Sequence, residues 1–229
     1  MSAARLDRTS LLRPARQETY EKVFGTVYVG LMTNVLLALS CAPLLAALAL
    51  VRDPLLSWPF FAVLSAVCAP ALAGAFRCFA LLDDGSTAVL RAFWSGYRRA
   101  ATRALAAWLA GTVAVSVLAL DAVVVAGTSW GVALVPFFAT GAALVVAVTV
   151  AVLVVVAESP RRVRELVRPC LYLVARRWYL TAPTLAVLAL AVAVVLLKPV
   201  LGLLLALAPL LYVVWATMRY VVRPLLTES

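Results

Sequence analysis

Six long apolar runs make up most of this 229-residue chain. A helix needs about 20 apolar residues to cross the hydrocarbon core of a bilayer, and every run supplies them. With 66% hydrophobic and 13% charged residues, a soluble fold would expose far more apolar surface than soluble monomers do. We therefore predict an all-α polytopic membrane protein with six transmembrane helices. The predicted spans are about 23–51, 55–82, 104–126, 132–157, 178–197 and 199–222.

The basic residues fall almost entirely on one side of these spans. Of the 20 Lys and Arg residues, 18 share the side of the N-terminal tail, and only Arg52 and Lys198 lie on the other side. Cytoplasmic segments of membrane proteins carry such an excess of positive charge. The chain is thus predicted to place both tails, 1–22 and 223–229, in the cytoplasm. A single transmembrane domain, 23–222, would lie in the cell (plasma) membrane.

The formal net charge of +10 also has a membrane explanation. Basic residues that flank spans are attracted to the anionic lipids of the cytoplasmic leaflet. A bilayer with an anionic inner leaflet is therefore the predicted partner of these residues, and nucleic acid is not.

The first long inner connector, 86–103, has the pattern of a helix that lies in the headgroup layer. Its residues Leu90, Phe93, Trp94 and Tyr97 recur at helical spacing and share one stripe, while its arginines occupy the opposite arc. We predict an amphipathic interfacial helix here, separate from the transmembrane helix that follows it.

The second inner connector, 159–177, has a similar pattern. Ser159 is a good N-cap with Pro160 in the first turn, and apolar residues then follow at helical spacing. Pro169 is expected to break or kink this second interfacial helix. Eight residues of the two connectors are predicted to contact a partner or lipid: Arg91, Phe93, Trp94, Tyr97, Arg98, Arg99, Arg161 and Arg162.

Two polar residues stand out inside the predicted spans. The amide of Asn34 cannot stay unpaired in hydrocarbon, so it faces another helix or a wet cavity, and an interhelical hydrogen bond is the favoured alternative. Arg77 lies near the inner end of the second span, where its side chain can reach the headgroups. Five spans also contain a proline, which fits either simple kinks or helices broken at a substrate site: Pro43, Pro70, Pro136, Pro183 and Pro209.

Patterns for catalysis and for metal binding are weak. The chain has no His, its ten carboxylates are scattered rather than paired inside the spans, and its four cysteines form no CxxC pair. We predict that the protein is not an enzyme and has no metal site and no cofactor. An enzyme that uses carboxylates alone is the least favoured alternative.

The stretch Pro70–Gly85, followed by the aromatic and basic segment Ala92–Ala100, resembles the YesL family of small bacterial membrane proteins. Asn34 and Pro43 in the first span, and Arg77 at the end of the second, fit the same resemblance. Genes of this family often neighbour those of carbohydrate ABC importers. The resemblance therefore implies an accessory role in sugar uptake, and it implies no catalytic or binding residues.

Two functions are carried forward from the sequence. The first is an accessory or regulatory component of a carbohydrate ABC importer, which contacts importer subunits through the cytoplasmic helices. The alternative is a small autonomous transporter or channel, with a site lined by Asn34 and the proline-broken helices.

Overall fold

The computed structural model of the protein describes residues 14–51, 57–86, 88–197 and 202–227. Within these ranges the secondary structure is helical and contains no strand. The predicted connectors at Arg52 and Lys198 lie outside the described residues. The helices are α1 (Pro14–Ser40), α2 (Ala42–Leu50), α3 (Trp58–Ser65), α4 (Cys68–Asp83), α5 (Val89–Ala126), α6 (Gly131–Glu158), α7 (Val163–Arg176), α8 (Trp178–Leu197), the π-helix η1 (Gly202–Ala206) and α10 (Leu207–Thr227).

Four helical segments are long and apolar enough to cross a membrane: the α3–α4 segment Trp58–Asp83, α5, α6 and α8. The bent α1–α2 pair adds a fifth if it is counted as one span. The all-helical fold is thus confirmed, and its apolar helices support an integral membrane protein. The predicted number of six spans is not confirmed. In the sixth predicted span, 199–222, the described residues form η1 and most of α10, and α10 is not among these candidates.

Prolines break the first two predicted spans. Proline lacks an amide N–H, and its ring clashes with the carbonyl four residues earlier in a helix. Pro43 lies in the first turn of α2, where α1 and α2 meet at a bend of 65°. Pro70 lies in the first turn of α4, just after the break that separates α3 from α4. Pro136 and Pro183, in contrast, lie inside α6 and α8, which continue through them.

α5 is one uninterrupted helix of 38 residues and corrects the predicted boundary at residues 103 and 104. At 1.5 Å per residue it is about 57 Å long, nearly twice the ~30 Å hydrocarbon core of a bilayer. Its apolar C-terminal part is long enough to cross that core. Its basic N-terminal part is a continuation of the same helix and not a separate helix.

α7 corresponds to the second predicted interfacial helix and begins later than expected. Its first residue is Val163 and Arg162 takes the N-cap position, so the predicted cap at Ser159 is wrong. Pro169 lies inside the helix and does not end it. One face of α7 is anchored in the protein through Leu166, Cys170 and Val174.

The core is built around α4, which packs between α1, α5 and α6. Small side chains make the α4–α5 crossing close. A Cβ atom on Gly96 of α5 would lie only 3.2 Å from the Cα of Gly74 and 2.8 Å from the Cβ of Arg77. Helices in lipid associate through such small residues because the hydrophobic effect does not drive one apolar helix onto another there.

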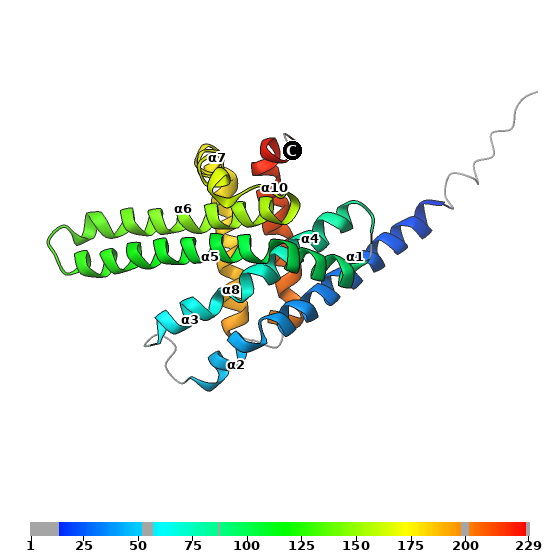
Figure 1. Ribbon diagram of the computed structural model, residues 1–229, viewed down its shortest axis with the longest axis horizontal. Helices are drawn as coiled ribbons and strands as arrows, with labels where there is room; N and C mark the ends of the chain where they lie inside the picture. Colours follow the sequence, from blue (N-terminus) through cyan, green and yellow to red (C-terminus); the bar gives the residue numbers. More distant parts are fainter. Residues whose placement is uncertain (1–13, 52–56, 87, 198–201, 228–229) are drawn as a thin grey trace, which may run out of the picture.

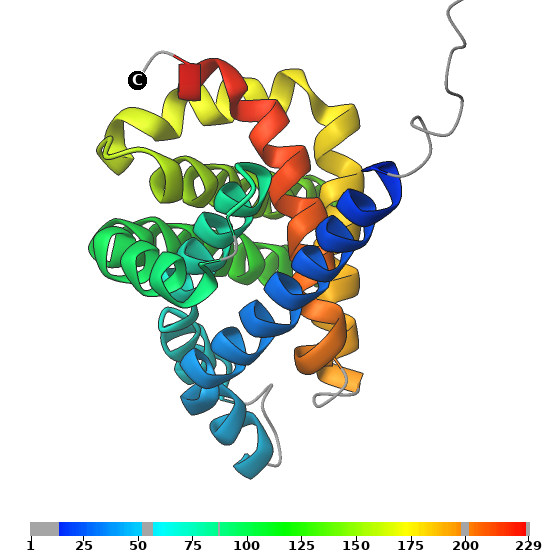
Figure 2. The ribbon, with the colours of Figure 1, turned by 90° about the vertical axis from the view of Figure 1, so that its right-hand side faces the viewer.

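The helices gather at one end of the molecule and diverge at the other (Figure 1). The C-terminal ends of α4, α6 and α10 and the N-terminal end of α5 lie at the gathered end, with α7 beside them. The α5–α6 hairpin projects away from it, and α8 and α10 run side by side in another direction (Figure 2). Apolar side chains cover the projecting hairpin, and Val132 at its tip is 92% exposed. A surface of this kind suits contact with lipid chains.

Candidate functional site

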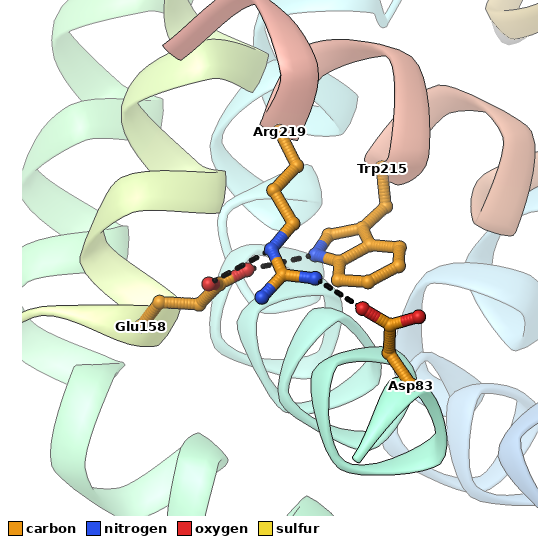
Figure 3. A network of polar contacts seen from close by, with 4 residues as sticks. All are labelled: Asp83, Glu158, Trp215 and Arg219. Atoms are coloured by element: carbon orange, nitrogen blue, oxygen red, sulfur yellow. Dashed lines mark hydrogen bonds and ion pairs between the residues drawn. The ribbon is translucent and has the colours of Figure 1, made fainter. Parts of the chain in front are cut away.

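A polar network links three helix ends where the helices gather (Figure 3). Arg219 of α10 donates from Nη1 to Oδ2 of Asp83 at 2.7 Å, and its Nε lies 3.3 Å from Oε2 of Glu158. Trp215, one turn earlier on α10, donates from Nε1 to Oε1 of Glu158 at 3.1 Å. The Arg219 guanidinium also stacks over the Trp215 ring, 5.0 Å from its centroid. One cation thus holds the last residues of both α4 and α6.

This arrangement suits a structural clamp better than a reacting group. Both carboxylate oxygens of Glu158 already accept a hydrogen bond or ion pair, and the Glu158 side chain is only 12% exposed. Within the described ranges, no three thiol or carboxylate groups lie together as metal ligands would.

A basic pocket of about 270 Å³ lies between α4, α5 and the end of α6. Its charged lining consists of Arg77, Arg99, Arg103 and Glu158. Arg103 is held in place by the segment that follows α6: its Nη1 donates to the backbone oxygen of Ser159 at 2.8 Å and to that of Arg161 at 3.3 Å. This side chain joins α5 to the α6–α7 connection and donates to two backbone carbonyl groups of that connection.

The predicted aromatic stripe of residues 90–101 does not form one exposed face. Phe93 is fully buried and packs over Gly74 of α4, whereas Leu90 is half exposed. Trp94 and Tyr97 contact the Phe93 ring and each other. The buried stripe is instead Val89, Ala92, Phe93, Gly96, Ala100, Ala104 and Ala107. Phe93 is therefore a core residue, which corrects its predicted role in partner or lipid contact.

The predicted basic contact residues remain at the surface. Arg91, Arg98, Arg99 and Arg162 are exposed, and Arg161 is partly buried. Arg98 and Arg162 line none of the sites described above, whereas Arg99 lines the basic pocket. Of these predicted contact residues, Arg99 therefore belongs to the pocket, and the other arginines lie at the surface outside it.

Asn34 makes the interhelical hydrogen bond that the sequence predicts. Its Oδ1 accepts from the backbone N–H of Ala208 at 2.6 Å, and its side chain is buried. Ala208 is the second residue of α10, where no carbonyl of that helix is available to the backbone N–H groups. Asn34 thus secures the start of α10.

The residues of the network were not among the predicted site residues, although the sequence carries a signal for them. Asp83 and Glu158 each end an apolar run, and Arg219 lies near the end of another. The second, fourth and sixth predicted spans all run in the same direction, so these opposite charges near their inner ends are expected at the same level. Ser159 does not form the predicted helix cap and lines the basic pocket instead.

Comparisons of the chain with protein-family models, with curated proteins and with solved structures give no match. The resemblance to the YesL family therefore stays a prediction.

Proposed function

We propose that this chain is a six-pass protein of the cell membrane whose gathered, polar end faces the cytoplasm. The distribution of charge supports the proposal. Of the 20 basic residues, 18 fall on the predicted cytoplasmic side of the spans, which is the side to which this end belongs. The proposal is also supported by the apolar surface of the α5–α6 hairpin, which points away from that end (Figure 1). In this orientation α10 would serve as the sixth pass, with Arg219 at its cytoplasmic end.

Within that membrane setting, the protein would act as an accessory or regulatory component of a carbohydrate ABC importer. The importer itself is suggested by the sequence resemblance. The surface for contact is suggested by α7, whose anchored face leaves Arg164, Arg168 and Arg176 exposed next to Leu171 and Tyr172. A helix face that combines cations with apolar and aromatic side chains has the composition of a protein docking surface. It fits an acidic partner surface best.

The alternative function, autonomous transport, depended on Asn34 as a site residue. The Asn34 side chain is buried and its Oδ1 is bonded to the backbone of α10, so it supports helix packing. No observation on the described residues favours a transport site around Asn34, and we do not propose one.

Co-purification from native membranes tests the accessory role. The double charge reversal Arg164→Glu and Arg168→Glu should abolish recovery of the importer's subunits while the protein still inserts and accumulates normally. A matched control is Arg223→Glu on α10, an exposed arginine outside the α7 surface, which should leave recovery unchanged. If no importer subunit co-purifies with the unaltered protein, or if the purified protein alone moves sugars across liposomes, the accessory role is wrong.

A further inference from the structure

The basic pocket between α4, α5 and α6 has an excess of positive over negative side chains in its lining. Three arginines line it, Arg77, Arg99 and Arg103, against the single carboxylate of Glu158. Each oxygen of that carboxylate contacts one side chain of α10, Trp215 or Arg219. Among the described residues, the Arg77 guanidinium forms no hydrogen bond and no ion pair within 4 Å, although its side chain is partly buried and its charge interacts with that of Glu158.

A second observation in this pocket concerns Ser159. Its residue is only 5% exposed and lines the pocket, yet its hydroxyl has no hydrogen-bond partner among the described residues. A buried hydroxyl without a partner is costly, so such groups are normally paired with protein, water or a ligand. The Ser95 hydroxyl, on the α5 wall, donates to Ala92 of its own helix and can still accept a hydrogen bond.

The backbone geometry opens the pocket to Arg77. Gly96 lies on the pocket wall with no side chain, and a Cβ atom there would be 2.8 Å from the Cβ of Arg77. The absence of a side chain at residue 96 therefore leaves room for the stem of Arg77 to cross α5. Alanine at this position would force the two helices apart or displace the arginine.

The size and chemistry of the pocket select the ligand class. A volume of about 270 Å³ lies just below the ~300–1,000 Å³ of sites that enclose whole drug-sized molecules, so it suits a compact group. Guanidinium forks and hydroxyl donors together match the oxygens of a phosphate group. The pocket lies beside the C-terminal end of α6, and in the orientation proposed above this end would be at the level of the phospholipid headgroups.

We propose that this pocket binds a phosphate group, with Arg77 and Ser159 as its principal ligands and Arg99 at its entrance. The phosphate belongs either to a phospholipid headgroup or to a soluble phosphate compound. Arg103 is fixed by its bonds to the α6–α7 connection, so binding here would also tie the position of α7 to occupancy of the pocket.

Binding to the full-length protein, purified in detergent and freed of lipid, tests the proposal. The probes are inorganic phosphate and short-chain phosphatidic acid, with chloride at equal ionic strength as the reference and thermal stability as the readout. Saturable stabilisation is expected from at least one probe. Arg77→Gln should weaken it roughly tenfold, as the loss of one charge-assisted hydrogen bond does. Ser159→Ala should weaken it several-fold, and Arg91→Gln, an exposed arginine outside the pocket, should not change it.

The two probes separate the two sources of phosphate. Stabilisation by inorganic phosphate as well as by the lipid identifies a soluble ligand, while stabilisation by phosphatidic acid alone identifies a headgroup site. If Arg77→Gln cannot be purified in folded form, Ser159→Ala carries the test. The proposal is wrong if neither probe gives saturable stabilisation. It is also wrong if Ser159→Ala binds the probes as tightly as the unaltered protein and the control Arg91→Gln do.

Discussion

Arg219 holds carboxylates from two other helices at once, Asp83 of α4 and Glu158 of α6. Its Nε and Nη1 point in different directions from one rigid plane, and the same plane stacks on Trp215. A lysine ammonium is a single point charge on a flexible stem and cannot reproduce this geometry. The two pairs also differ in environment, because the Asp83 side chain is 55% exposed and that of Glu158 is 12% exposed. Solvent therefore screens the Asp83 pair more strongly.

Arg219→Lys and Glu158→Gln should each lower the unfolding free energy by about 1–3 kcal/mol, the range for hydrogen bonds to charged groups in protected surroundings. Asp83→Asn is the matched control and should cost well under 1 kcal/mol because its pair is exposed. Thermal unfolding of the purified protein in one detergent would measure all three. Equal losses for Asp83→Asn and Glu158→Gln would show that the clamp does not depend on the buried pair.

For single residues, the sequence could predict that a polar side chain must form a hydrogen bond, but it could not identify the partner. Asn34 had to bond another helix because an amide in hydrocarbon must be paired, and it does. Its partner is a backbone N–H of Ala208, which is available only because α10 starts there after a π-helix. Because the partner is a backbone group, the alanine side chain at residue 208 does not indicate this hydrogen bond. The prediction of a cap at Ser159 is wrong for a related reason, since a Ser-Pro pair occurs in turns and loops as well as at helix starts.

α5 shows how a sequence pattern can place a helix correctly and misplace its ends. The first third of α5 is rich in arginine and the rest is apolar, which suggested two helices. Charge ends a membrane span but does not end a helix, and residues 89–126 contain no proline. The predicted stripe also differs from the buried face. The buried residues of α5 include the small residues Ala92, Gly96 and Ala100 together with Phe93, whereas Leu90 and Trp94 are exposed.

Proline scanning distinguishes one long helix from two. Leu105→Pro lies in the middle of α5 and should remove a backbone hydrogen bond and displace a carbonyl, at a cost of about 3 kcal/mol or more. If a new helix began near residue 104, the same proline would fall in its first turn and be tolerated. Leu105→Ala controls for the loss of the side chain. Comparable thermal stability of the proline and alanine variants would argue against a continuous helix.

For the whole molecule, composition and charge could predict the class of protein, and its helical fold is confirmed. The directions of the helices could not be predicted. The α5–α6 hairpin diverges from α8 and α10 (Figure 1). The close Gly74–Gly96 approach between α4 and α5 is one of the contacts that the sequence pattern does not show. Hydropathy reports that a segment is apolar and long, whereas its direction depends on contacts between helices that are distant in sequence.

Cysteine accessibility in intact cells tests the central claim, a membrane protein whose polar end is cytoplasmic. The background replaces the native cysteines with alanine: Cys41, Cys68, Cys78 and Cys170. Ser129→Cys, exposed at the tip of the α5–α6 hairpin, should react with an impermeant maleimide added outside. Glu165→Cys, exposed on α7, should react only after the cells are permeabilised. Labelling of Glu165→Cys in intact cells, or protection of Ser129→Cys, would contradict the cytoplasmic placement of the polar end.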